Sequence, residues 1–255
     1  MLHKFDSNSE AVFNKVSQRQ DSTFKLLYFP IHGVAYASRL ILATTGAKFE
    51  SASPTNWVEQ KATTPFGVLP VLYETVTTKE GDSEVQEVFE IPESEAIERY
   101  LARKFQLLGQ TPWEEMKINA FVSSTKSLTF LAFSRIPTVK DTVQKQEMVQ
   151  DMVNKSVPAW VQSHERYLVA NGTNGHYIGD KLTLADIRAL IVIELVLALT
   201  EDRVISQEKT PAIWKLWEGV RAIPSFVAWR NTDSYKQFDA GYQTFVKGLL
   251  PLKEQ

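Results

Sequence analysis

The chain has 255 residues, a formal net charge of −2 and no cysteine. This length suits one large domain or two smaller ones with a sizeable hydrophobic core. The near-neutral charge gives no indication of a nucleic-acid or membrane partner. The lack of cysteine excludes disulfides, zinc–thiolate sites and a protein thiol as nucleophile.

The first 23 residues are predicted to be a loosely docked extension in which apolar residues such as Phe13 and Val16 could form a short helix. The segment is polar, without the apolar run of a secretion signal or the Arg-rich bias of a transit peptide. The most apolar segment of the chain, residues 187–199, is too short to span a membrane. We therefore expect a cytoplasmic protein without membrane contact.

A buried strand is predicted over residues 24–29, followed by a turn at Pro30 and Gly33 and a helix over residues 34–45. Tyr28 then lies at the C-terminal end of a strand and faces the N-terminus of the next helix. Ligands bind at this edge of open α/β sheets, and a helix N-terminus favours an anion. The Tyr28 phenol is therefore a candidate hydrogen-bond donor to an anionic ligand atom, although the aromatic residues of this strand could also simply fill a core.

The remaining elements up to residue 106 complete the order βαβ followed by ββα, which is typical of a thioredoxin-like domain. We assign this domain to residues 24–106, with a polar loop at residues 75–85 that turns at Gly81-Asp82. The predicted elements are strands near residues 48–51, 68–73 and 87–91 and a helix at residues 94–105.

After a linker at residues 107–112, the chain is predicted to form an all-helical domain over residues 113–255. Thr183 and Asp186 have the spacing of a helix-capping box. The fold class is therefore a thioredoxin-like α/β domain followed by an all-α domain. The predicted helices are residues 113–135, 142–169 with a bend at Pro158, 184–199, 211–222 and a further one from Pro224.

Four separated motifs then point to one family. They are Tyr28-Phe29-Pro30-x-x-Gly33-x-Ala35 with Arg39, Val68-Leu69-Pro70, Glu93-Ser94, and Gly179 to Asp186. Together, over about residues 24 to 230, they resemble the cytosolic glutathione transferases of the tyrosine type, closest to the sigma class. The resemblance implies an enzyme that conjugates glutathione, as cosubstrate, to an apolar electrophile, with no metal or other cofactor. It also implies a homodimer.

The resemblance further implies roles for individual residues. The Tyr28 hydroxyl would donate a hydrogen bond to the glutathione sulfur and favour its ionised form. Val68, next to Pro70, would offer its backbone N–H and C=O to the cysteinyl part. Ser94, which is also expected to cap its helix, would hold the γ-glutamyl carboxylate, and Glu93 the ammonium.

Two further groups complete the implied site. Trp57 and Lys61 would bind the glycine carboxylate of glutathione. Phe29, Tyr36, Phe130 and Phe133 could line a pocket for the electrophile. Taken singly, each of these residues also fits a purely structural role: an edge-strand proline, a helix cap, a surface lysine, a loop anchor or core aromatics.

The sequence departs from the family pattern at three positions, one of which is Glu93, where sigma-class members usually carry Gln. Val34 stands where serine-type and cysteine-type relatives carry the catalytic residue and several tyrosine classes carry an arginine. Asn119 stands where the partner subunit's acid usually reaches the γ-glutamyl amine. Two alternatives therefore stay open: a protein that binds glutathione or an apolar ligand without turnover, and a glutathione-dependent isomerase or peroxidase. His32 is expected to face solvent.

Overall fold

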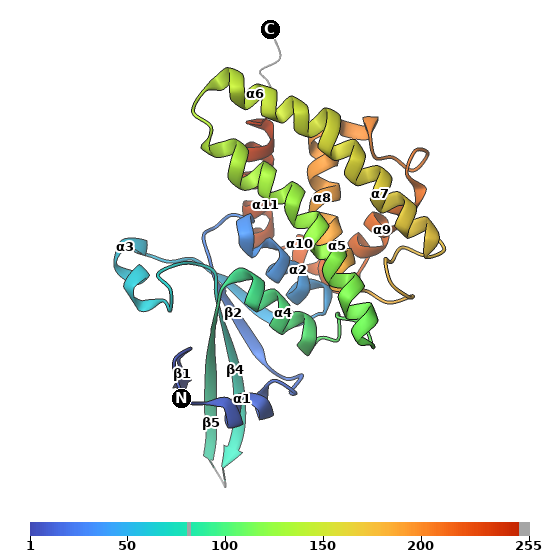
Figure 1. The fold of residues 1–255 in the computed structure, drawn as a ribbon. Helices are drawn as coiled ribbons and strands as arrows, with labels where there is room; N and C mark the ends of the chain where they lie inside the picture. Colours follow the sequence, from blue (N-terminus) through green and yellow to red (C-terminus); the bar gives the residue numbers. More distant parts are fainter. Residues whose placement is uncertain (81–82, 250–255) are drawn as a thin grey trace. The chain divides into compact units, whose positions relative to one another are not determined.

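The computed structural model describes residues 1–80 and 83–249, so the predicted turn at Gly81-Asp82 lies outside the described residues. The chain divides into two compact units, and the predicted combination of a mixed α/β domain with an all-helical one is confirmed (Figure 1). Unit 1 contains residues 1–105 and 228–238. Unit 2 contains residues 106–227 and the chain after residue 238.

Unit 1 is built on a five-stranded mixed sheet with the order β1-β5-β4-β2-β3. Strand β2 runs parallel to β3 and antiparallel to β4. In β2 the Phe24 and Leu26 side chains are buried while Lys25 is exposed, so this strand is buried on one face, not on both as expected. The central strands are β2 (Thr23–Leu27), β3 (Lys48–Ala52), β4 (Val71–Glu80) and β5 (Ser83–Pro92).

Two helices of unit 1 pack side by side, and both were predicted from the sequence. Helix α2 follows a 3-10 turn at Gly33–Ala35 and is buried along its whole length. Helix α4 buries one face and exposes charged residues on the other. Their bounds are Tyr36–Thr44 for α2 and Ser94–Lys104 for α4, and the short α3 spans Trp57–Gln60 before a 3-10 turn at Lys61–Thr63.

The first 23 residues are part of unit 1, and the prediction of a loosely docked extension is wrong. Strand β1 (Leu2–His3) pairs in parallel with β5, and helix α1 (Glu10–Val16) packs Val16 against Val76 and Phe89. The sequence could not reveal this pairing, because the two partner segments lie more than 80 positions apart and β1 is only two residues long.

A buried ion pair also ties this segment to the sheet. Lys104 Nζ lies 2.9 Å from Glu74 Oε1 and donates to the backbone carbonyls of Val16 at 3.3 Å and Ser17 at 3.2 Å. Both charged side chains are almost fully buried. The N-terminal segment is thus held by charge-assisted hydrogen bonds as well as by apolar packing.

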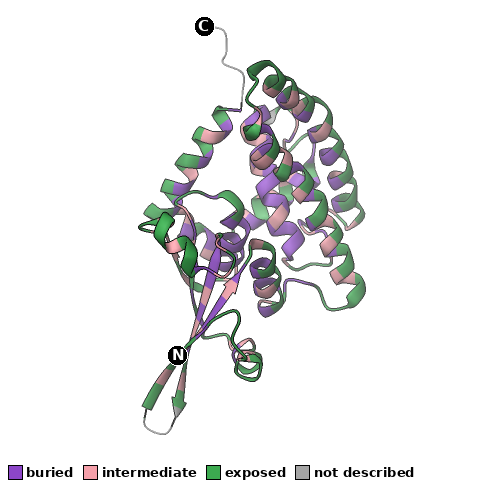
Figure 2. Ribbon diagram, turned by 60° about the vertical axis from the view of Figure 1, so that its left-hand side comes forward, coloured by how far each residue is buried: buried purple, intermediate pink, exposed green. Residues whose placement is uncertain are grey.

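The prediction of a polar loop at residues 75–85 is wrong as well. Strand β4 extends to Glu80, β5 begins at Ser83, and the two strands pair along this stretch as the arms of a long hairpin. The ladder extends from Val71 opposite Pro92 to Glu80 opposite Ser83. Figure 2 shows that the far half of this hairpin is largely exposed, which explains its polar sequence. The threonines of this stretch, Thr75, Thr77 and Thr78, are good strand formers on a solvated surface.

Unit 2 is all-helical and has α8 at its centre, since most of that helix is buried. The predicted capping box is present at its start, where the Thr183 N–H donates to Asp186 Oδ2 at 2.8 Å. The helix expected from residue 142 is interrupted by a π turn at Met152–Ser156, and Pro158 then lies in the first turn of α7. Figure 1 labels these helices.

The α-helices after residue 106, including the unpredicted α11, are α5 (Pro112–Phe130), α6 (Thr142–Asp151), α7 (Val157–Ala170), α8 (Leu184–Thr200), α9 (Pro211–Arg221), α10 (Pro224–Arg230) and α11 (Asp233–Lys247). A π turn at Leu131–Arg135 and a 3-10 turn at Ile136–Thr138 continue α5, and a 3-10 turn at Glu201–Arg203 follows α8.

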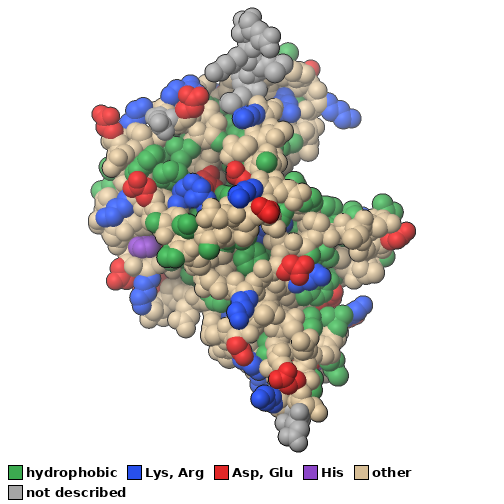
Figure 3. Space-filling view, turned by 180° about the vertical axis from the view of Figure 1, so that it is seen from behind, with side chains coloured by type: hydrophobic (Ala, Val, Ile, Leu, Met, Phe, Trp, Pro, Cys, Tyr) green, Lys and Arg blue, Asp and Glu red, His purple; other side chains and the backbone are tan. Residues whose placement is uncertain are grey.

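Charged side chains of both signs are interspersed over the face seen in Figure 3, in keeping with the small net charge. Within the described ranges, no helix is both long enough and apolar enough to serve as a membrane span.

Candidate functional site

The sheet register brings most of the candidate residues of unit 1 to one edge. Leu27 pairs with Ala52 on one side and with Val71 on the other, and Val71 pairs with Pro92. The C-terminal ends of β2, β3 and β5 therefore meet the first residue of β4. The segments that continue from these ends contain Tyr28, Trp57, Lys61, Val68, Pro70, Glu93 and Ser94.

Tyr28 follows β2 directly, and its backbone N–H donates to the Ala52 carbonyl at 2.9 Å. Its side chain is 8% exposed, and the hydroxyl lies so close to Gly33 that a Cβ there would come within 2.6 Å of it. Gly33 has φ +45°, so this tight turn depends on glycine for both its space and its backbone conformation.

The electrostatics keep this phenol protonated. Burial raises the pKa of Tyr28, while the backbone N–H of Val34, which donates to the hydroxyl, and the charge of Arg39 act in the opposite direction. Since the oxygen accepts from Val34, the phenolic proton remains for another acceptor. This turn therefore presents a hydrogen-bond donor at neutral pH.

Arg39 stabilises the turn after Tyr28 by donating hydrogen bonds to its backbone carbonyls, a role that was not predicted from the sequence. Its side chain is fully buried, with Nη1 donating to the Ile31 carbonyl at 2.5 Å and Nη2 to the Phe29 carbonyl at 3.2 Å. The guanidinium lies 5.7 Å from the centroid of the Tyr28 ring. Burial lowers the pKa of Arg39 to about 10, so it stays charged at neutral pH. The sequence signal was an arginine inside the apolar stripe of a helix.

His32 does not face solvent, contrary to expectation. It is 2% exposed and stacks on the Tyr36 ring at 3.8 Å, with the Tyr235 ring 5.5 Å away. Burial lowers the pKa of His32 to about 3, so the imidazole is neutral. Tyr36 is equally buried, and its assignment to the wall of an electrophile pocket does not fit this burial.

A row of aromatic rings leads away from Tyr28. The Phe29 ring meets the Tyr28 ring edge-on at 5.5 Å and the Trp57 ring at 5.8 Å. The Lys61 stem lies beside Gly67, where a Cβ would be 3.4 Å from the Lys61 Cε. Trp57 thus contacts Phe29, the residue after Tyr28, and Lys61 lies beside Gly67, the residue before Val68.

Val68 lies in an irregular segment before β4 and is 42% exposed. The peptide bond between Leu69 and Pro70 is cis. None of the hydrogen bonds among the described residues involves the Val68 backbone, so its N–H and C=O are available to a ligand.

Glu93 and Ser94 form the junction between β5 and α4. Glu93 is the N-cap residue and has φ +70°, a conformation that costs a non-glycine residue about 1–3 kcal/mol. Ser94 is the first helical residue, and the helix has no side-chain cap, so the predicted Ser94 cap is not made. The hydroxyl and the N–H groups of this first turn are placed to bind an anion.

The other two candidates for the electrophile pocket belong to unit 2. Phe130 lies in the last turn of α5 and is 59% exposed. Phe133 lies in the π turn that follows, with the Phe245 ring 5.6 Å away.

Comparisons with known proteins agree with this architecture. Residues 129–233 match the family model described as glutathione S-transferase, C-terminal domain. The chain is 33% identical to glutathione S-transferase 1 of Ascaris suum over 64% of this chain and 75% of that protein. It is 29% identical to hematopoietic prostaglandin D synthase of Gallus gallus over 81% of this chain and 94% of that protein.

Among solved structures, a sigma class GST of Fasciola hepatica superposes with a TM-score of 0.66 at 24% identity, covering 82% of this chain and 95% of that one. This likeness concerns the fold.

Proposed function

Since the chain belongs to the glutathione transferase family, we propose that it conjugates the glutathione thiolate to an apolar electrophile and that Tyr28 stabilises this thiolate. The observation that carries the proposal is the Tyr28 hydroxyl, which accepts from the Val34 N–H and keeps its own proton for the sulfur. Glutathione is the cosubstrate, and this chemistry needs no metal or further cofactor.

These groups can supply the free energy that is needed to lower the pKa of the glutathione thiol. A free thiol with a pKa of about 8.5 is only a few per cent ionised at neutral pH, and lowering this pKa by about two units corresponds to about 2.7 kcal/mol. A hydrogen bond to a charged group contributes about 1.5–3 kcal/mol. A helix N-terminus adds about 0.3–1 kcal/mol. The thiolate lone pair then forms the new bond to carbon, and the leaving group departs with its electrons.

The glutathione contacts follow from the edge of the sheet described above. The exposed Val68 backbone beside Pro70 would pair with the cysteinyl part. The start of α4, with Ser94 and Glu93, would hold the γ-glutamyl end. Trp57 and Lys61 would bind the glycine carboxylate. Within unit 1, Phe29, whose ring contacts the Tyr28 ring edge-on, remains a proposed contact for the electrophile.

A second candidate is a glutathione-dependent isomerase, because one relative is named a prostaglandin D synthase. A third is binding without turnover, favoured by Val34, which is 52% exposed at the turn and carries no charge. Incubation with glutathione and a chlorodinitrobenzene tests for conjugation, and a second incubation with glutathione and an isomerisable substrate tests for isomerisation. Conjugation consumes one thiol per product formed, isomerisation of a suitable substrate returns the thiol, and pure binding yields no product.

We also propose a homodimer in the cytoplasm, where glutathione is kept reduced. Isologous pairs are the commonest form of soluble oligomer. Light scattering at micromolar concentration is expected to give twice the chain mass of 28.9 kDa, and a mass equal to one chain would contradict the dimer.

A further inference from the structure

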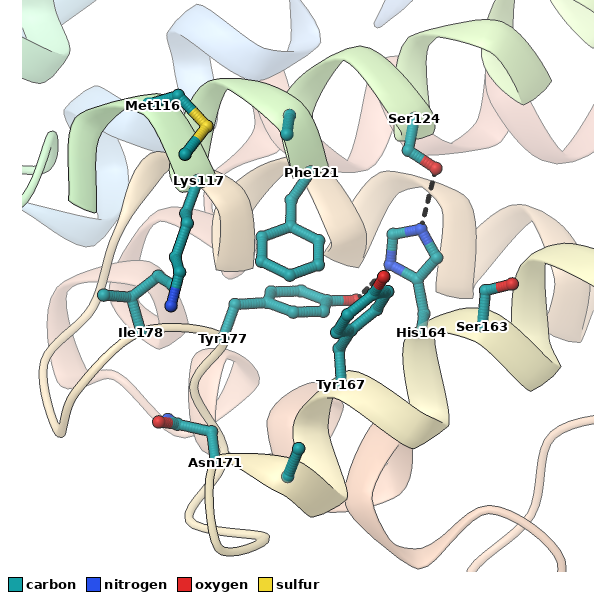
Figure 4. A pocket seen from close by; sticks show the side chains of 12 residues that line it. Met116, Lys117, Phe121, Ser124, Ser163, His164, Tyr167, Asn171, Tyr177 and Ile178 are labelled. Atoms are coloured by element: carbon teal, nitrogen blue, oxygen red, sulfur yellow. Dashed lines mark hydrogen bonds between the residues drawn. The ribbon is translucent and has the colours of Figure 1, made fainter. Parts of the chain in front are cut away.

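Unit 2 contains a half-open cavity of about 460 Å³ between α5, α7 and the loop that follows α7 (Figure 4). Its walls are mainly aromatic: the Phe121 and Tyr177 rings stack at 4.4 Å, and Tyr167 meets Phe121 edge-on at 5.3 Å. A cavity of this size can hold a small organic ligand. None of its lining residues belongs to the set proposed for glutathione or the electrophile.

A buried hydrogen-bond chain fixes the polarity at one end of the cavity. His164 is 2% exposed and lies with Nδ1 2.6 Å from the Tyr177 hydroxyl and Nε2 2.9 Å from the Ser124 hydroxyl. Burial lowers the pKa of His164 to about 4 and raises that of Tyr177 well above its usual value, so the imidazole is neutral and the phenol protonated.

We assign the donors from the buried Tyr177 hydroxyl, whose proton needs an acceptor and has His164 Nδ1 at hydrogen-bond distance. The buried phenol donates its proton to Nδ1, the imidazole donates from Nε2 to the Ser124 oxygen, and Ser124 keeps its own proton for a further acceptor. The Ser124 end of the cavity therefore presents a hydrogen-bond donor.

The opposite end carries a positive charge. Figure 4 shows Lys117 beside Ile178 at one end of the cavity, and Ser124 with Ser163 at the other. The aromatic walls lie between these two polar ends.

The acidic groups near Tyr177 are already occupied by backbone donors. Asp186 accepts from the Tyr177 and Thr183 N–H groups, and Glu165 accepts from the Ala212 and Ile213 N–H groups. The negative charges of these two carboxylates are thus partly compensated by the backbone N–H groups that donate to them.

We propose that this cavity is a second ligand site, one that takes a planar aromatic carboxylate. The ring system lies against Phe121, Tyr167 and Tyr177, the carboxylate pairs with Lys117, and an acceptor atom on the far edge receives the Ser124 proton. The site does not depend on the glutathione chemistry proposed above.

Calorimetric titration of the full chain with naphthoate and with its neutral isostere naphthamide tests the proposal. Naphthoate should bind about tenfold more tightly than naphthamide, which corresponds to one well-placed charge interaction. Lys117→Met keeps the stem and should remove this difference. Lys140→Met, which exchanges an exposed lysine outside the cavity lining, should leave it unchanged.

Ala120→Trp fills the cavity from an exposed position on α5 and should abolish binding of both compounds. Saturating S-hexylglutathione, which occupies the proposed glutathione site, should not displace naphthoate. The proposal is overturned if naphthoate does not bind at millimolar concentration, if S-hexylglutathione displaces it, or if its affinity is the same in the Lys117→Met and Ala120→Trp variants as in the unmodified chain. A lack of conjugation activity would leave these outcomes unchanged.

Discussion

Replacing Lys104 with methionine should destabilise the protein far more than removing an average charged residue. The Lys104 and Glu74 side chains are 1% and 0% exposed, and Glu74 also accepts from the Ser22 hydroxyl at 2.5 Å and from the Tyr100 hydroxyl. The methionine keeps most of the side-chain volume but leaves the Glu74 carboxylate buried without its cation. Removing one partner of a buried pair costs about 3–5 kcal/mol.

For a chain of this length, that loss lowers the melting temperature by roughly 6–20 °C. Equilibrium urea unfolding, followed by tryptophan fluorescence, measures the free energy of unfolding directly. The control is Lys155→Met, since Lys155 pairs with Asp151 at 2.8 Å on the surface, where the side chains are 73% and 66% exposed. That variant should change the free energy of unfolding by less than about 0.5 kcal/mol.

The double variant Glu74→Met, Lys104→Met distinguishes a buried charge from a simple packing defect. With both charges removed, much of the stability should return, because replacing a whole buried pair by apolar residues is often neutral. If Lys104→Met alone costs less than about 1 kcal/mol, or if the double variant loses the sum of the two single losses, the reasoning about this pair is wrong.

Four further predictions concern the site and the pH dependence. Tyr28→Phe should lower turnover by about ten- to a thousandfold and raise the pH of half-maximal rate, with little change in glutathione affinity; an unchanged rate at acidic pH would remove Tyr28 from the mechanism. Lys61→Ala with Ser94→Ala should weaken glutathione binding in calorimetry by at least about tenfold, since each removes a contact to a carboxylate, and tight binding by the pair would refute the assigned site. Val34→Arg should lower the pH midpoint of the thiolate absorbance in the glutathione complex, and a midpoint that stays or rises would mean that this position does not face the sulfur. The pKa of His164 falls from 6.5 in the unfolded chain to about 4 in the fold, so the unfolded state binds the proton first as the pH is lowered. The free energy of unfolding should therefore fall between about pH 6.5 and 4, by on the order of 3 kcal/mol. Urea unfolding at several pH values should show a smaller dependence of this free energy on pH in His164→Gln.

Features with a local chemical signature could be predicted from the sequence. The capping box at Thr183 and Asp186 and the turn after Tyr28 each depend on residues only a few positions apart in the sequence. Both occur as expected. The order of strands and helices followed from hydrophobic periodicity for the same reason. The position of Tyr28 at the end of a strand followed from that order, whereas the other candidate residues came from the family resemblance; the register of β2, β3, β4 and β5 brings the segments that contain them together.

Features that depend on distant partners could not be predicted. The role of Arg39 depends on carbonyls of a turn whose backbone path is not visible in the sequence. The burial of His32 depends on Tyr235, some 200 positions later in the chain. Glu93, rather than Ser94, occupies the N-cap position of α4, with a positive φ that no local sequence pattern indicated.

Strand β1 has a consequence for how the protein avoids aggregation through the edge of its sheet. An open sheet edge presents unpaired N–H and C=O groups that can recruit a strand from another molecule. Residues 1–3 cover the edge of β5 at Val88 and Phe89, where the Val88 N–H donates to the Met1 carbonyl at 2.8 Å. The opposite edge, β3, is short and carries Lys48 and Glu50, which protect it by charge. Deleting the first few residues would therefore leave the backbone N–H and C=O groups of β5 at Val88 and Phe89 unpaired, as a template for edge-to-edge aggregation.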